Sequence, residues 1–259
     1  MRSLRAWLRV ARLMLVLTLG LALACFVSLL ERLPGCDWMP LRQRLTRWFL
    51  ARLSAALPFE VKVHGELPGQ PMLWVSNHVS WVDIPLLGAL LPLTFLSKAE
   101  VRQWPVAGWL ADKAGTLFIR RGSGDSRMIN AQLATHLSRG RSLLVFPEGT
   151  TTDGQGLRTF HGRLMASAIE AGVSVQPVAL RYRRDGQACE LAPFIGDDDL
   201  VSHLLRLFGN DRGVVEIHLL PALSSAHQDR NLLAQQARSA IHAVVCEAQE
   251  ETAIAAAAA

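Results

Sequence analysis

The chain has 259 residues, half of them hydrophobic, and its mean hydropathy of +0.22 favours one moderately sized domain that binds membrane lipids over a freely soluble protein. Its net charge of +5 suits an anionic membrane, and the lack of a basic run interleaved with aromatic residues argues against nucleic acid as a partner. Four widely spaced cysteines without a C-x-x-C pair and eight histidines without a ligand-like cluster predict a reducing compartment, no disulfide framework and no metal site.

The N-terminal segment is basic and then strongly apolar. Four arginines precede residues Leu13 to Leu30, which carry no charge. This run would form a helix of about 27 Å, enough for a thin bilayer. A secretory signal peptide is the alternative interpretation, because it also begins with basic residues and an apolar core. Residues 21–25 (LALAC) resemble the cleavage site of a lipoprotein signal peptide, but Ala22 occupies the position where that site prefers leucine. We therefore favour a membrane anchor over a cleaved signal peptide.

The next stretch, Leu41 to Leu57, alternates arginines with leucine, tryptophan and phenylalanine. Its apolar residues fall on one helical face with basic edges, which predicts an amphipathic helix in the headgroup region. A surface helix packed on the core would show the same pattern. Arginines flank the apolar run on both sides, so the positive-inside rule sets no orientation. We therefore expect residues 1–57 to form a two-helix anchor that enters one leaflet and returns.

Strand and helix patterns alternate over the following part of the chain. Strands are predicted at residues 59–67, 71–77, 93–98, 116–121, 142–146, 173–182 and 214–220. Helices are predicted at Ile84–Leu91, Asp125–Ser138, Leu164–Ala171 and Asp229–Glu250. The alternation predicts an α/β fold over residues 58–250, with a mixed, largely parallel central sheet flanked by helices. The Ala-rich residues 251–259 are expected to be disordered.

Two short motifs directly follow predicted strands. Asn77 to Asp83 places His78 and a carboxylate five positions apart, and Phe146 to Thr150 places Glu148 before a glycine turn. Catalytic groups of α/β proteins commonly lie on loops at strand ends, so the pattern indicates an enzyme. The sequence contains no G-x-S-x-G, P-loop or G-x-G-x-x-G motif, which argues against a serine hydrolase, an NTPase or a dinucleotide enzyme.

The two motifs resemble N-H-x4-D and F-P-E-G-T, the first and third signatures of the lysophosphatidate acyltransferase (glycerolipid acyltransferase) superfamily. Gly115–Arg121 resembles the second block of this family and Val175–Leu180 the fourth, so the resemblance covers Phe59 to Tyr182. It implies transfer of a fatty acyl group from an acyl thioester to the free hydroxyl of a lysolipid. The acyl thioester would be acylated acyl carrier protein (acyl-ACP) or acyl-CoA, with no cofactor and no covalent acyl-enzyme.

The resemblance implies that His78 is the general base and that Asp83 orients it and stabilises the imidazolium, as the acid of a triad does. Ser80 and Asp83 also fit a capping box with Ser80 as N-cap. In that case His78 precedes the helix and folds back over its first turn. A purely capping role for Asp83 remains the alternative.

The resemblance further implies that Glu148, Gly149 and Thr150 help to bind the acceptor head group and that Arg121 meets an anionic group. A polar turn and a surface arginine would be the structural alternatives. Lys98 is a weaker candidate for the same anionic contacts.

The third motif departs from the usual lysophosphatidate acyltransferase pattern, which has an arginine after E-G-T. This chain continues Thr151-Thr152-Asp153-Gly154, a version that resembles the lyso-ornithine lipid acyltransferase branch. Asp153 would then meet a cationic amino group. Lysophosphatidate remains an alternative acceptor, with Arg158 or Arg163 supplying the phosphate contact.

Two other functions are also compatible with the motifs: a non-catalytic lipid-binding protein of the same fold, and an acyl hydrolase.

The expected location follows from the acyl donors of a transferase. If the apolar helix crossed the membrane once with its N-terminus in the cytoplasm, His78 would lie on the outer side of the membrane, away from activated acyl donors. We therefore expect the inner (cytoplasmic) membrane, with the catalytic domain facing the cytoplasm.

Overall fold

The computed structural model describes residues 2–119 and 126–257 of the chain. Their strands form one sheet in the order β1-β8-β6-β2-β5-β3-β4, with β7 added to β6. The strands are β1 (Phe59–His64), β2 (Leu73–Ser76), β3 (Thr94–Lys98), β4 (Leu117–Ile119), β5 (Leu143–Val145), β6 (Val175–Arg184), β7 (Gln187–Ala188) and β8 (Gly213–Leu219). From β6 to β4 all neighbours are parallel, whereas β8 runs antiparallel to β6 and parallel to β1. The mixed, largely parallel sheet is confirmed.

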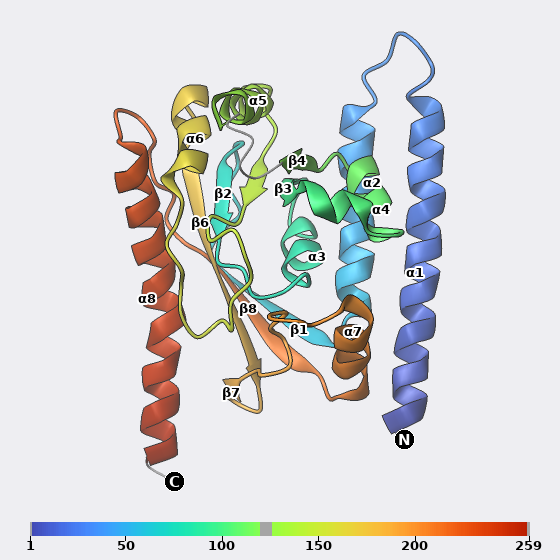
Figure 1. Cartoon of the computed structure of the whole chain (residues 1–259), viewed down its shortest axis with the longest axis vertical. Coiled ribbons are helices and arrows are strands. Elements are labelled where there is room, and N and C mark those ends of the chain that lie inside the picture. Colours follow the sequence, from blue (N-terminus) through green and yellow to red (C-terminus); the bar gives the residue numbers. More distant parts are fainter. Residues whose placement is uncertain (1, 120–125, 258–259) are drawn as a thin grey trace.

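Helices cover both faces of this sheet (Figure 1). One layer holds α5 (Ser126–Ser138), α6 (Ala166–Ala171) and α8 (Arg230–Ala257), and the other holds α2 (Met39–Ala56), α3 (Asp83–Gly88) and α7 (Leu200–Gly209). Trp74 packs in the second layer, while its neighbours Leu73 and Val75 pack in the first. All three side chains are fully buried, as expected for a central parallel strand with both faces covered.

Two further helices lie on the side of the second layer. The helix α1 (Arg2–Leu30) packs antiparallel against α2, and α4 (Ala107–Lys113) lies beside it. Close approach of α1 and α2 requires a small residue, because a Cβ atom on Gly20 would lie 2.3 Å from the Phe49 ring. At the other end of α1, the Arg9 guanidinium donates to the carbonyls of Phe208 (2.8 Å) and Asn210 (2.6 Å), at the C-terminus of α7.

Several predicted boundaries were wrong. The first helix begins at Arg2, well before Leu13, because arginine is a good helix former. The helix α3 ends at Gly88, whereas Leu91 was predicted. The predicted patterns missed α4 and α7, although Asp199 caps α7 by accepting hydrogen bonds from two backbone amides of its first turn.

The C-terminal helix also differs from its prediction. Whereas we expected the helix to end at Glu250 and residues 251–259 to be disordered, α8 continues to Ala257. The physical reason is that alanine has the highest helix propensity of all residues. Residues 120–125 lie outside the described part of the chain, and they include Arg121 and Asp125, the first residue of a predicted helix.

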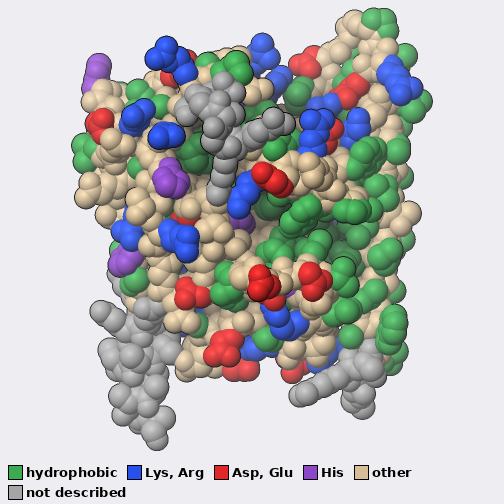
Figure 2. Space-filling view, in the orientation of Figure 1, with side chains coloured by type: hydrophobic (Ala, Val, Ile, Leu, Met, Phe, Trp, Pro, Cys, Tyr) green, Lys and Arg blue, Asp and Glu red, His purple; other side chains and the backbone are tan. Residues whose placement is uncertain are grey.

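Residues Leu4–Leu30 of α1 form a helix long and apolar enough to cross a membrane. Many of its large side chains are exposed, among them Leu4, Trp7, Leu8, Met14, Leu15, Phe26 and Leu29. In the space-filling view hydrophobic side chains gather over α1 and α2 and on the adjoining surface around α4 (Figure 2).

Candidate active site

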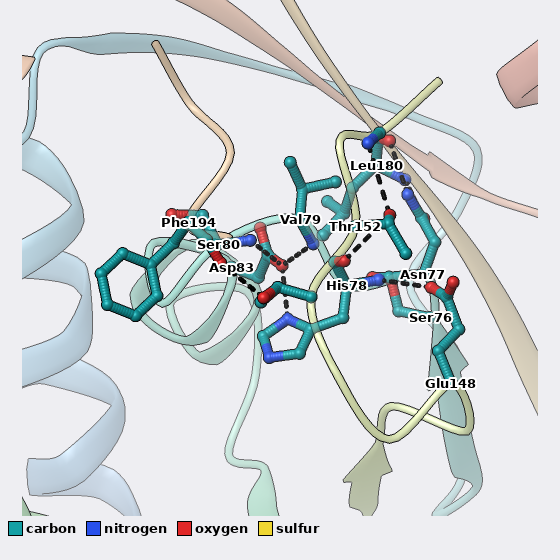
Figure 3. A network of polar contacts seen from close by, with 12 residues as sticks. Ser76, Asn77, His78, Val79, Ser80, Asp83, Glu148, Thr152, Leu180 and Phe194 are labelled. Carbon is teal, nitrogen blue, oxygen red and sulfur yellow. Dashed lines mark hydrogen bonds and ion pairs between the residues drawn. The ribbon is translucent and has the colours of Figure 1, made fainter. Parts of the chain in front are cut away.

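The site lies where β2 and β5 end side by side. These strands pair in parallel, with Leu73 opposite Leu143 and Val75 opposite Val145. His78 follows the end of β2 and Glu148 follows the end of β5, so the two loops meet at one edge of the sheet. The backbone amide of His78 donates to Glu148 Oε1 at 2.9 Å, which joins the first and third motifs (Figure 3).

The His78 imidazole is paired with the Asp83 carboxylate. Nδ1 lies 2.7 Å from Asp83 Oδ2, and the same oxygen accepts the backbone amides of Val79 (2.8 Å) and Ser80 (3.0 Å). Asp83 is fully buried, whereas 18% of the His78 side chain is exposed. Because a carboxylate only accepts hydrogen bonds, Nδ1 of a neutral His78 carries the proton and Nε2 has a free lone pair. This tautomer can take a proton from a hydroxyl group.

The predicted capping box is only half formed. Asp83 accepts the Ser80 amide as predicted, but α3 begins at Asp83 itself, and Ser80 is not its N-cap. The buried Ser80 hydroxyl has no hydrogen-bond partner among the described residues. Residues 81 and 82 form turns before the helix, and these turns bring the Asp83 carboxylate back to the His78 loop.

Tyr182 is a site residue that the sequence did not reveal. Its hydroxyl, from β6, donates to Asp83 Oδ1. Burial and the neighbouring Asp83 charge hold the pKa of Tyr182 well above its ordinary value of 10, so this phenol stays a donor. Tyr182 lies 99 residues from Asp83 along the chain, and only the parallel pairing of β2 and β6 brings them together.

Two further residues hold the His78 loop in place. The Phe146 ring stacks on the imidazole, with ring centroids 3.9 Å apart and an angle of 11° between the planes. The Asn77 side chain donates to the Leu180 carbonyl (3.0 Å) and accepts the Leu180 amide (2.8 Å), which fixes the end of β2 to β6. Asn77 of the first motif and Phe146 of the third motif therefore both help to position the His78 imidazole.

The Glu148 carboxylate joins the loop after β2 to the far part of its own loop after β5, and it has little exposed surface. Oε1 accepts the His78 amide, and Oε2 accepts the Arg158 amide at 2.8 Å. Burial raises the pKa of Glu148, and these two amide bonds oppose the shift. Gly149 has a positive φ of 70° and its amide donates to the Phe146 carbonyl, which makes a tight turn directly after Glu148.

Two cavities adjoin this loop. One of 410 Å³ is lined by Val79, Leu180, Tyr182, Cys189, Asp198 and Arg206, among others. The other, of 590 Å³, is lined by residues 150–153, 156–158 and 194–196. Asp153 and Ile195 line both. The Thr152 amide donates to the His78 carbonyl at 2.8 Å, so the second cavity directly adjoins the histidine loop.

The predicted acceptor residues therefore divide into groups. Thr150 and Asp153 line the second cavity, as does Arg158. Glu148 and Gly149 line neither cavity and instead shape the loop, and Arg163 and Lys98 also lie outside both linings. Arg121 falls outside the described residues.

The segment around Phe194 was also missed by sequence reasoning. Its amide donates to the Val79 carbonyl at 2.9 Å, and its carbonyl accepts the Thr151 hydroxyl. This segment is held to α7, because buried His203 forms hydrogen bonds with both the Trp81 indole (3.0 Å) and the Pro193 carbonyl (3.1 Å).

Among the described residues, no group of three or more His, Cys, Asp and Glu side chains is arranged to hold a metal ion.

Comparison with known proteins decides the family. Residues 60–181 match the Acyltransferase family model. A lyso-ornithine lipid O-acyltransferase of Pseudomonas aeruginosa is 70% identical over 241 residues, which are 93% of each chain. The chain belongs to the acyltransferase family. A 1-acyl-sn-glycerol-3-phosphate acyltransferase of Neisseria gonorrhoeae is 35% identical over 197 residues, 74% of this chain and 77% of that one.

A solved structure shows that the fold is shared. The crystal structure of PlsC, the 1-acyl-sn-glycerophosphate acyltransferase of Thermotoga maritima, superimposes with a TM-score of 0.70 at 21% identity. The match covers 96% of this acyltransferase and 98% of PlsC, so it includes most of the N-terminal helices as well as the sheet.

The pairing of His78 with Asp83 predicts that His78→Ala lowers the turnover of acyl thioester with lysolipid by about 10²–10⁴-fold, the usual contribution of a general base. The melting temperature should change little, because His78 is partly exposed. His242→Ala, on exposed α8 surface, is the matched control and should keep full turnover. Retention of a tenth of the activity by His78→Ala would contradict a role in proton transfer.

The Tyr182 contact predicts a loss of turnover that depends on Asp83. Tyr182→Phe keeps the edge contact with Phe59 but removes the hydroxyl, so kcat should fall about tenfold while KM stays constant. In an Asp83→Asn background the same change should have little further effect, because both substitutions disturb one interaction. If Tyr182→Phe lowers kcat by the same factor in the wild-type and Asp83→Asn proteins, Tyr182 acts only through packing. The melting temperatures of all variants should be measured alongside kcat.

Proposed function

We propose that this acyltransferase transfers a fatty acyl group from acyl carrier protein or acyl-CoA to the free hydroxyl of lyso-ornithine lipid. The observation that carries the acceptor assignment is the second cavity, where Asp153 and Arg158 line the same space beside the His78 loop. The name of the 70% identical Pseudomonas aeruginosa relative supports the same acceptor.

In the proposed reaction, His78 Nε2 removes the hydroxyl proton as the acceptor oxygen attacks the thioester carbonyl carbon. Asp83 stabilises the resulting imidazolium through Nδ1. The tetrahedral intermediate then collapses, the carbon–sulfur bond breaks, and the leaving thiolate takes the proton from the imidazolium. The products are an ester and a free thiol, and His78 regains its neutral form without any covalent acyl-enzyme.

The proposed acceptor matches the charges of the cavity. An ornithine head group carries a carboxylate and a side-chain ammonium. Asp153 is exposed, and its Oδ1 accepts the Gln155 amide at 2.9 Å, which leaves Oδ2 for the ammonium. The Arg158 side chain would meet the carboxylate. Lysophosphatidate offers a phosphate to Arg158 but no cation to Asp153, so it is the weaker candidate.

The acceptor proposal predicts that the purified enzyme prefers lyso-ornithine lipid to lysophosphatidate. Asp153→Asn retains the acceptor for the Gln155 amide but removes the charge, so kcat/KM for lyso-ornithine lipid should fall about fivefold, the effect of an exposed charge contact worth about 1 kcal/mol. Activity on lysophosphatidate should stay constant or rise. Asp185→Asn is the control, because this exposed residue lines neither cavity. A wild-type preference for lysophosphatidate would overturn the assignment.

We also propose that α1 and α2 form a hairpin anchor in the inner membrane, with the catalytic domain in the cytoplasm. The exposed apolar surface of α1 supports lipid contact. Arg9 and Arg5 bind the N-terminal part of α1 to the region around Phe208 and Asp211, and α2 leads directly into β1. A helix that crossed the bilayer would have to leave these contacts, whereas a hairpin in one leaflet keeps them.

The hairpin predicts that protein tags at both ends of the chain lie in the cytoplasm. Protease added to intact cells should therefore leave a tag at residue 1 and a tag at residue 259 uncut, and disruption of the membrane should expose both. Cleavage of the C-terminal tag alone in intact cells would contradict the hairpin.

A further inference from the structure

The turn between the 3-10 helix η1 (Ala99–Gln103) and α4 exposes three large apolar side chains. We call residues Trp104–Trp109 the η1–α4 turn. Val106 is 46% exposed, and Trp104 and Trp109 are each 38% exposed. The helix α4 contacts α1, and the turn lies against α1 in Figure 1. Its apolar side chains therefore adjoin the exposed apolar surface of the proposed anchor.

The backbone of this turn is strained at Val106. This residue has φ 60° and ψ −59°, and the Ala107 amide donates to the Pro105 carbonyl at 2.6 Å, the geometry of a classic γ-turn. A β-branched residue with positive φ is a genuine outlier. The other two non-glycine residues with positive φ among the described ones are the polar Asp185 and His227. Backbone outliers of this kind cluster at functional sites, so the turn is a candidate contact site.

The turn is also rigid. The Gly108 amide donates to the Trp104 carbonyl at 3.0 Å, and the Leu110 amide donates to the Val106 carbonyl at 2.8 Å. A Cβ atom on Gly108 would lie 2.5 Å from the carbonyl oxygens of Val101 and Arg102, so the turn folds tightly back on η1. The direction in which Val106 and the tryptophans point is therefore set by the backbone.

Basic side chains flank the exposed tryptophans. The Arg102 side chain is 63% exposed and pairs with Asp112 at 3.0 Å. The Lys113 ammonium lies 5.9 Å from the centre of the Trp109 ring. Tryptophan next to cationic residues is typical of segments at the boundary between lipid headgroups and acyl chains, where the ring is partly buried and the charge stays in water.

We propose that the η1–α4 turn is a second membrane contact, which inserts Trp104, Val106 and Trp109 into the headgroup–acyl boundary beside α1. It rests on the proposed hairpin anchor and adds a contact from the catalytic domain itself. A hairpin alone leaves the domain free to rotate about its axis, whereas a second contact fixes the angle between the sheet and the bilayer. The ends of β2 and β5, with His78, then keep a constant orientation to the lipids that supply the acceptor.

Fluorescent labels at single cysteines test the contact in full-length protein whose four native cysteines are replaced. The probe membranes are vesicles of phosphatidylethanolamine and phosphatidylglycerol that contain a nitroxide-labelled lipid. Labels on Val106→Cys and Leu15→Cys should be quenched by the nitroxide lipid and protected from iodide in the water. Leu232→Cys is the matched control, because Leu232 is also 46% exposed but lies on α8, across the sheet from α1. Its label should show the opposite behaviour.

Each other outcome overturns a defined part of the inference. If the Val106 label is quenched by iodide as strongly as the Leu232 label, the turn does not enter the membrane. Protection from both quenchers would indicate a protein partner, such as a second copy of the chain, and would equally refute the proposal. If the Leu15 label alone fails, the anchor proposal is wrong, and the turn is then a membrane contact of the catalytic domain without a second contact from α1.

A second variant separates the membrane contact from folding and from chemistry. Val106→Asn places a residue that tolerates positive φ, so the melting temperature should stay constant or rise. Combined with Trp104→Ser and Trp109→Ser, it should raise KM for acceptor in vesicles roughly tenfold, through lost burial of apolar surface. Turnover of a monomeric short-chain acceptor should not change, and Leu232→Asn should change neither value. An unaltered KM for vesicle acceptor in the triple variant would contradict a role in presenting the site to the bilayer.

Discussion

The buried carboxylate of Asp83 is the interaction on which the site depends. A charge removed from water is costly unless hydrogen bonds replace its hydration. Here the backbone amides of Val79 and Ser80, the His78 imidazole and the Tyr182 hydroxyl all donate to it. Because the donors come from the β2–α3 loop and from β6, the carboxylate also fixes the loop to the sheet. Loss of a buried donor such as the Tyr182 hydroxyl would therefore affect both catalysis and local stability.

A second buried carboxylate supports the first. Glu148 joins the His78 amide to the Arg158 amide, and so connects the loop after β2 with the segment that lines the larger cavity. In this arrangement Glu148 holds the backbone of both segments. Phe194 adds a third tie, from the Val79 carbonyl to Thr151. Residues of this hydrogen-bonded network (Figure 3) also line the two cavities, among them Val79, Thr152 and Phe194.

The N-terminal hairpin is part of the same layered structure and not a separate attachment. Leu13 and Leu50 belong to one hydrophobic core with Trp74 and Leu144 of the central strands. Gly88 lies against Leu50, where a Cβ atom would approach to 2.3 Å, so α2 packs closely on the helix that begins with Asp83. Any orientation that lipids impose on the hairpin is consequently transmitted to the site by direct packing.

The sequence determined the chemical groups of this acyltransferase and the class of its fold. Motifs at the ends of apolar runs marked His78, Asp83 and Glu148, because loops at strand ends commonly carry the catalytic groups of α/β proteins. Local patterns also located most strands, since the central ones are continuous apolar runs. They missed α4 and α7, and they failed at helix ends, where packing and caps decide the boundary.

Only the tertiary structure decided the contacts between segments distant in the chain. No spacing rule connects Tyr182 with Asp83 or Phe194 with Thr151, because these pairs arise from strand order and loop packing. The structure likewise showed that Glu148 supports the His78 loop, since both of its carboxylate oxygens accept backbone amides. A sequence records which groups are present, but hydrogen-bond partners depend on distances that the folded sheet alone sets.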